Sequence, residues 1–152
     1  MLVLCLTGVA PVLGKAYFMP IEDMILSADV IAVVKIVNLE AVKKEEEALQ
    51  YKDQLAKIEV KETIKGDLTG KEYIMIPSFF PCGIVDVASP GEYLVFLEMR
   101  EGILTSSNWH WSVRKVSGDK VPWFSDDLRE LPDMPLEQVK EQIEFILGQG
   151  SS

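Results

Sequence analysis

The stretch from Pro90 to Glu98 constrains the fold of this chain most, because it is an extended run with two apolar faces. Alternate residues of a strand point to opposite sides, and both sets are apolar here: Tyr93, Val95 and Leu97 on one side, Leu94 and Phe96 on the other. Such a strand must be covered by protein on both faces. The best partner is the segment from Asp29 to Val37, which is equally rich in β-branched residues. The pattern therefore predicts pairing between strands that lie far apart in the sequence.

Further strands are predicted on either side of this pair. The first strand extends to Leu39, and the charge cluster at 43–47 that follows it is interpreted as a solvated loop. In the next segment the apolar alternation changes phase near Leu55, which predicts a bulge or bend there. That strand ends at the turn 64–67, and another runs from Lys71 to Pro77.

The second half of the chain continues the β pattern. A turn at Arg100 to Ile103 leads into a strand expected over 104–111, and a hairpin loop at Ser117 to Asp119 joins 112–116 to 120–124. Five or six short strands with two apolar faces lose their exposed edges when they close into a barrel. The sequence therefore predicts a mainly β chain with a closed barrel.

Two helices are expected to flank the strands. Proline, two acids and spaced apolar residues over 20–27 predict a short helix, which we expect to cap the barrel end. Over 134–148, proline starts and glycine stops an amphipathic helix. Its apolar stripe, expected to dock on the sheet, consists of Leu136, Val139, Ile143, Ile146 and Leu147.

The first sixteen residues are interpreted as a signal peptide. Leu2 to Leu13 is almost wholly apolar, too short to span a membrane, and followed by small residues at Gly14 and Ala16, where a signal peptidase cleaves. A buried first strand is the alternative. The basic region that usually opens a signal peptide is missing, which is consistent with a true start upstream of Met1. We expect residues 17–152 to form one exported domain without stable membrane insertion.

Charge and cysteine content limit the partners and the chemistry. The chain has 24 acidic against 15 basic residues and a formal net charge of −9, which disfavours binding to nucleic acid and to anionic membrane surfaces. Removal of the signal peptide would leave Cys82 as the single cysteine, so no internal disulfide is expected. The fold must then be stabilised by its apolar core.

Five motifs stand out along the chain: Ser-Ala-Asp-Val-Ile at the first long strand, Val60 to Gly66, Cys82-Gly83, Gly91 to Leu97 and the closing Pro-Leu-Glu helix. Together they resemble those of small exported bacterial proteins related to the tissue inhibitor of metalloproteinases and netrin-like domains. The resemblance covers roughly 21–147. It implies a five-stranded OB-type barrel with flanking helices and transfers no catalytic residue.

Aromatic residues provide the candidate binding site. Phe79 and Phe80 are adjacent in a loop flanked by proline and glycine, and Trp109 and Trp111 alternate around His110. Exposed faces of these four rings would form an aromatic patch for a protein or small ligand at one barrel mouth. The alternative, which is the commoner use of such a loop, is that the two phenylalanines plug the mouth.

An enzyme is the second class of function considered. Cys82, His110 and Asn108 are the residue types of a cysteine hydrolase, in which histidine takes the thiol proton and an amide orients the histidine. No helix start follows Cys82 to activate it, and the tryptophans around His110 are interpreted as strand packing. One histidine and one remaining cysteine provide no zinc-site spacing, and the acidic loops lack the alternating acids of calcium sites.

The sequence therefore favours an exported, non-catalytic binding domain with no cofactor or metal. A hydrolase centred on Cys82 and a structural accessory of an envelope assembly are the alternatives. Metalloproteinase inhibition through a chelating N-terminus is not expected, because Tyr17 would be the first residue and Cys82 has no partner with which to tether it.

Overall fold

The computed structural model describes residues 19–41, 53–77, 89–123 and 132–150. Its elements in chain order are α1 (Ile21–Ser27), β1 (Val30–Ala41), β2 (Asp53–Lys65), β3 (Tyr73–Pro77), β4 (Gly91–Arg100), β5 (Ile103–Ser106), the 3-10 helix η1 (Trp109–Ser112), β6 (Val113–Val116), β7 (Lys120–Val121), β8 (Met134–Pro135) and α2 (Leu136–Gln149). The predicted signal peptide lies outside the described residues.

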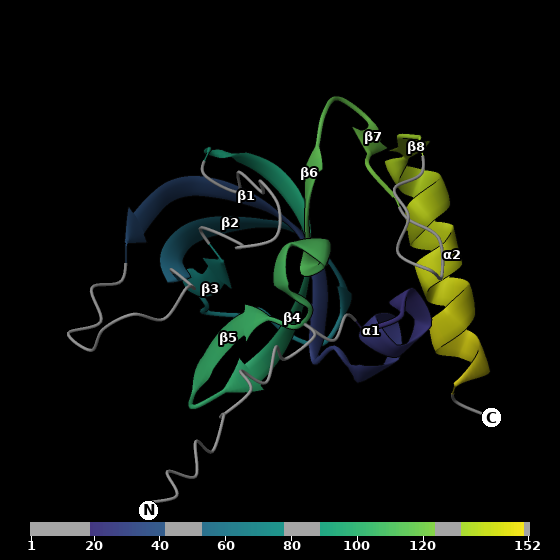
Figure 1. Ribbon diagram of the computed structural model, residues 1–152, viewed down its shortest axis with the longest axis horizontal. Coiled ribbons are helices and arrows are strands. Elements are labelled where there is room, and N and C mark those ends of the chain that lie inside the picture. The colour runs from purple at the N-terminus through teal and green to yellow at the C-terminus, as the bar shows by residue number, and fades with distance from the viewer. Residues whose placement is uncertain (1–18, 42–52, 78–88, 124–131, 151–152) are drawn as a thin grey trace, which may run out of the picture.

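Five strands close into a barrel (Figure 1). β1 pairs antiparallel with both β2 and β4, β2 pairs antiparallel with β3, and β4 pairs antiparallel with β5. The ring is completed by a parallel contact between β3 and β5, with Met75 opposite Thr105. β6 extends the sheet along β4. The order β1-β2-β3-β5-β4 and back to β1 confirms the predicted OB-type barrel.

The predicted central pair forms the wall between two apolar cores. β4 runs antiparallel to β1, with Leu97 opposite Val30 and Gly91 opposite Ile36. One face of this pair fills the barrel interior with Val30, Ala32, Val34, Ile36, Tyr93, Val95 and Leu97. The other face, with Ile31, Val33, Leu94 and Phe96, packs outside the barrel against α1 and α2. Both faces are apolar because both are covered.

The two helices lie side by side on the outer face of this wall. The expectation that the first helix caps the barrel end was wrong: Ile21, Met24 and Ile25 of α1 are buried in the outer core. Lys65 at the end of β2 donates from Nζ to the carbonyl oxygens of Ile25 (3.3 Å) and Leu26 (2.8 Å). A cation bonded to the last carbonyls of a helix satisfies acceptors that lack partners within it.

The closing helix α2 forms as the periodicity predicts. Pro135 precedes its first turn, and Val139 and Ile143 are fully buried in the outer core. The other members of the predicted stripe, Leu136, Ile146 and Leu147, pack against the same core. The predicted docking of α2 on the sheet is therefore confirmed, although the helix continues through Gly148 to Gln149.

Three local predictions need correction. β2 keeps its alternation at Leu55, since Gln54, Ala56 and Ile58 are all buried. The irregularities in its pairing with β1 lie instead between Ile31 and Ala32, between Val33 and Val34, and between Ile36 and Asn38. These shifts bend the long strands around the barrel, so bulges are present but at other positions.

The strand predicted over 104–111 ends at Ser106, and 109–112 form the 3-10 helix η1. Alternating tryptophans there do not mark a strand. The predicted hairpin at Ser117 to Asp119 is present, but its arms separate after the bridge between Ser117 and Lys120. Beyond that bridge the described residues of the two arms do not pair with each other: β6 pairs with β4, and β7 pairs with β8.

Candidate binding site at the barrel mouth

The two ends of the barrel differ in how they are closed. At one end, the turn between β2 and β3 folds Leu68 into the interior core, where it is 3% exposed. Gly66 in this turn has φ +77°, and a Cβ there would collide with the carbonyl oxygen of Asp29. The Thr69 hydroxyl, and then the Thr69 backbone N–H (2.8 Å), donate hydrogen bonds to Asp67 and lower the pKa of its carboxyl. This end is closed by the chain itself.

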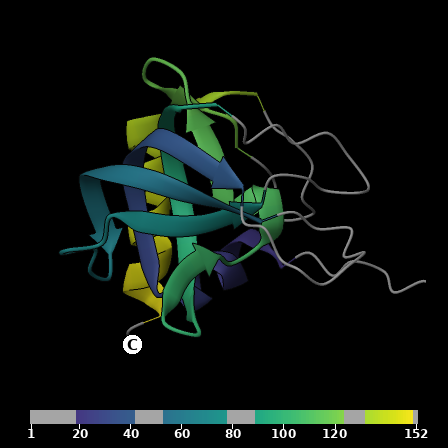
Figure 2. The ribbon, with the colours of Figure 1, turned by 90° about the vertical axis from the view of Figure 1, so that its left-hand side faces the viewer.

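The opposite end is the barrel mouth, defined here by the end of β1, the start of β2, the end of β3 and the start of β4. These strand ends meet on one side of the barrel (Figure 2). Behind them the interior is occupied by buried side chains, including Ile36, Ile74 and Ile76. A ligand at this end would therefore contact the rim and its connecting segments rather than enter the barrel.

Side chains of the rim hold both ends of the segment 78–88. Where the chain leaves β3, Gln54 donates from Nε2 to the carbonyl oxygen of Pro77 (3.4 Å). Where it returns, the hydroxyl of Tyr93 donates to the carbonyl oxygen of Ser89 (2.8 Å), and Lys115 donates from Nζ to the Ser89 hydroxyl (3.1 Å). Tyr93 is 1% exposed and Gln54 is 7% exposed, so two of these contacts come from buried scaffold residues.

The predicted site residues Phe79 and Phe80 belong to this segment, as does Cys82, and all three lie outside the described residues. The anchors at Pro77 and Ser89 nevertheless determine that the segment begins and ends at the mouth. Gln54, Tyr93 and Lys115 were not among the predicted site residues. The only sequence signal for them is a polar or amphipathic residue within an apolar strand pattern.

The tryptophan part of the predicted site is placed differently. η1 contacts β3, β4 and β5, and Trp111 on it is half-buried and packs against the outer core. The guanidinium carbon of Arg114 lies 5.5 Å from the centre of the Trp111 ring, within the range of a cation–π contact. The backbone of Trp109 begins η1, and its side chain lies outside the described part of the structure, as does that of His110.

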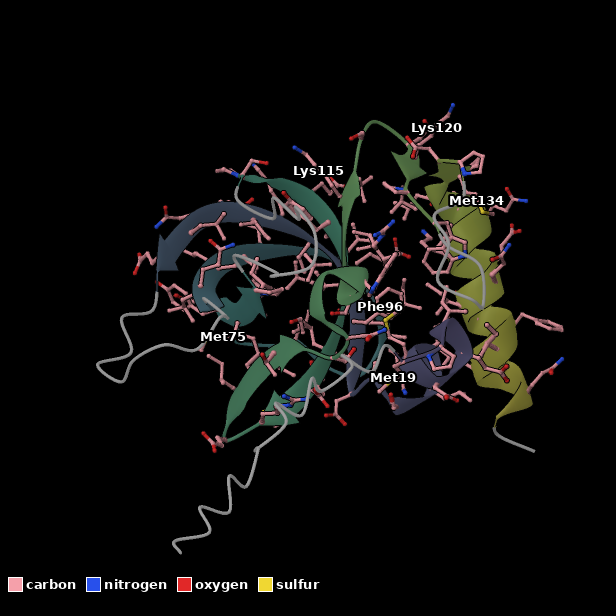
Figure 3. The ribbon with its side chains drawn as sticks, in the orientation of Figure 1. Met19, Met75, Phe96, Lys115, Lys120 and Met134 are labelled. Atoms are coloured by element: carbon pink, nitrogen blue, oxygen red, sulfur yellow. The ribbon has the colours of Figure 1, made fainter. Side chains whose placement is uncertain are left out.

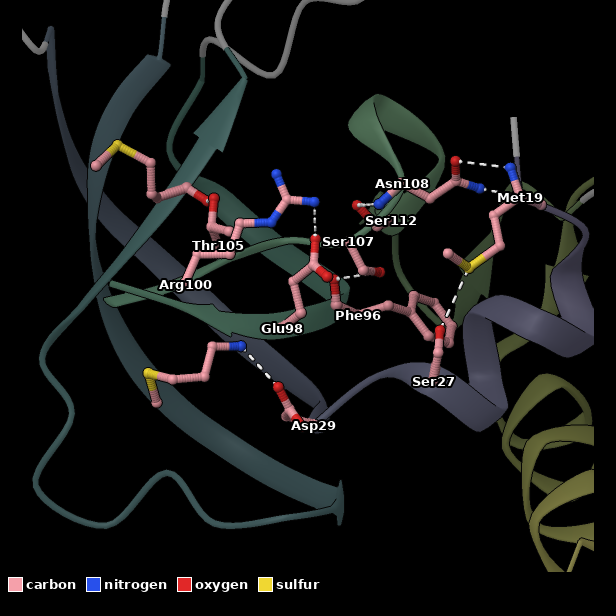
Figure 4. A network of polar contacts seen from close by, with 12 residues as sticks. Met19, Ser27, Asp29, Phe96, Glu98, Arg100, Thr105, Ser107, Asn108 and Ser112 are labelled. Atoms are coloured by element: carbon pink, nitrogen blue, oxygen red, sulfur yellow. Dashed lines mark hydrogen bonds and ion pairs between the residues drawn. The ribbon is translucent and has the colours of Figure 1, made fainter. Parts of the chain in front are cut away.

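Asn108, directly before η1, binds the main chain of Met19 (Figure 4). Its Oδ1 accepts from the Met19 N–H (3.1 Å) and its Nδ2 donates to the Met19 carbonyl oxygen (2.8 Å). Asn108 is 2% exposed, and its own backbone N–H donates to the hydroxyl of Ser112 (3.1 Å). The amide is thus engaged as a tether for the main chain at Met19.

This tether corrects one premise of the sequence reasoning. The chain entering α1 is held without a disulfide, through a pair of hydrogen bonds that spans 89 positions. No sequence pattern reveals such a contact, because an asparagine between Ser107 and a tryptophan is equally typical of a turn.

The fold places this chain in the class of OB-type barrel proteins with helices packed on the outer wall. Compared with known proteins, the chain matches no family model and no curated protein. No helix among the described residues has the length and apolar character needed to cross a membrane. Within the same residues, no three histidine, cysteine or acidic side chains gather as metal ligands.

Proposed function

We propose that this protein is an exported, non-catalytic binding domain, distantly related to netrin-like barrels, that recognises a protein or small ligand through the segments at the barrel mouth. The observation that carries the proposal is the anchoring of segment 78–88 at both ends by Gln54, Tyr93 and Lys115. A loop presented by a rigid scaffold is the usual arrangement of a binding site. The segment contains Phe79 and Phe80, aromatic residues of the type that dominates binding energy.

Binding is favoured over hydrolysis by the position of Asn108. In a cysteine hydrolase such an amide orients the histidine, whereas the contacts of Asn108 give it a structural role, as the residue that binds the main chain of Met19. The acidic chain, with its net charge of −9, is poorly suited to nucleic acid, so the proposed ligand is a protein or a small molecule. A structural role in an envelope assembly gains no specific support.

The proposal is tested by site-specific photo-crosslinking. A photoreactive amino acid replaces Phe80 in one variant and Glu72, an exposed residue directly before β3, in another. After irradiation in the envelope fraction, the variant labelled at 80 should give a discrete adduct and the variant labelled at 72 should not. Introducing Phe79→Ala should reduce the adduct.

Two outcomes would contradict this assignment. Equal adducts from both labelled positions would indicate random collision. Global unfolding of the double variant Phe79→Ala, Phe80→Ala would indicate that these rings plug the barrel, as in the alternative raised by the sequence.

A further inference from the structure

The outer side of α2 carries a second candidate site, separate from the barrel mouth. An open groove of about 490 Å³ runs along the helix and has a mostly apolar lining. The described residues that line it are Gln138, Glu141, Gln142, Phe145 and Ile146. Their spacing of three and four places them on one continuous stripe of the helix, next to the stripe that is buried in the outer core.

Phe145 is the apolar residue of this groove whose side chain stays mostly exposed in the folded protein. Its exposed fraction is 67%, the largest among the exposed large hydrophobic side chains of the described residues. Its neighbour Ile146 is partly buried against the outer core, so the groove has an apolar floor beside an exposed ring. Aromatic side chains with this arrangement are typical anchors of protein interfaces.

Charge determines which partner suits the groove. Glu141 lines it, Glu144 is exposed beside Phe145, and no lysine or arginine is among the described lining residues. Lys140, on the same helix, is engaged by Glu62 (2.8 Å) and Glu137 (2.7 Å). A second copy of this chain would place the same carboxylates against each other, and an anionic lipid surface would be repelled. A positively charged apolar surface is complementary.

We infer that the groove along α2 binds a basic amphipathic helix of a partner protein. The apolar face of that helix covers Phe145 and Ile146, while its lysine or arginine side chains pair with Glu141 and Glu144. A helix laid into an apolar groove is an established mode of peptide recognition. The inference is independent of the ligand proposed for the barrel mouth.

The test uses the full chain and a fluorescein-labelled peptide of leucine and lysine at helical spacing, about 18 residues long so that a helix can form. Fluorescence anisotropy should show saturable binding that weakens with added salt. Phe145→Ala should weaken binding about tenfold, as expected for an interface anchor. Glu141→Lys should weaken it similarly and flatten the salt dependence. A peptide with glutamate in place of lysine should not bind.

Matched variants separate the groove from general charge and from folding. Glu72→Lys makes the same charge change on the barrel and should bind almost as well as the original chain. Phe145→Ala should melt at an unchanged temperature, since the ring is exposed. The inference is overturned if Phe145→Ala binds as tightly as the original chain, or if Glu72→Lys and Glu141→Lys lose binding equally. A dimer in sedimentation equilibrium that Phe145→Ala abolishes would assign the groove to a second copy instead.

Discussion

Phe96 shows at the scale of a single residue how both faces of β4 are used. It is fully buried and lies between the barrel and the two helices (Figure 3). Its ring centre is 6.3 Å from that of Trp123, a tilted aromatic contact. The residue therefore joins the barrel wall to the outer layer.

We predict that Phe96→Ala lowers the free energy of unfolding by about 3 to 5 kcal/mol, because it removes a buried ring and leaves a cavity. Urea denaturation monitored by circular dichroism measures the change. Phe145→Ala is the matched control, since it removes the same ring from an exposed position and should change stability little. Similar losses from both variants would argue against the buried placement of Phe96.

At the scale of elements, Lys140 connects α2 to the barrel. Its Nζ lies 2.8 Å from Glu62 of β2 and 2.7 Å from Glu137, one turn earlier on the helix, and its side chain is 13% exposed. The hydrogen bonds to Glu137 and Glu62 raise the pKa of Lys140 above the ordinary value of 10.5. The ammonium form is therefore favoured by the folded state.

We predict that Lys140→Met costs about 0.5 to 1 kcal/mol at neutral pH, the upper part of the range for ion pairs near the surface. Because the folded pKa is raised, this stabilisation is fully present below the unfolded pKa of 10.5 and is lost as the pH rises through the folded value. Urea denaturation at pH 7 and above pH 10.5 should show the difference from the original chain shrinking. An equal loss of stability at both pH values would disprove the ion-pair origin. The control is Lys61→Met, which removes an exposed lysine of β2.

For the whole molecule, the prediction concerns export. The apolar run ending in Gly14-Lys15-Ala16 predicts cleavage after Ala16. The tether from Asn108 binds Met19, three residues after the predicted cleavage site. Intact mass measurement of the protein recovered outside the cytoplasm should give Tyr17 as the first residue. A product that retains residues 1–16 would contradict the proposed export signal.

The sequence by itself determined the architecture of this protein, because its apolar pattern has few compact solutions. Two apolar faces on 91–97 require cover on both sides, and the stripe of Val139 and Ile143 provides part of that cover. Strand pairing between β1 and β4, the barrel and the closing helix were all predictable on these grounds. The spacing of apolar residues indicates which faces of each strand and helix are buried, and few folds bury all of those faces together.

Only the tertiary structure decided the polar contacts and the details of the site. Asn108 and Met19 are 89 positions apart, and Lys65 and Leu26 at the end of α1 are 39 positions apart. Both pairings depend on how the closed barrel brings distant segments together. The tryptophans around His110 have the alternation of a strand, yet η1 forms there. A single hydrogen bond contributes little to the free energy of folding and leaves no periodic pattern in the sequence by which it could be recognised. Its geometry is determined once the apolar cores are packed.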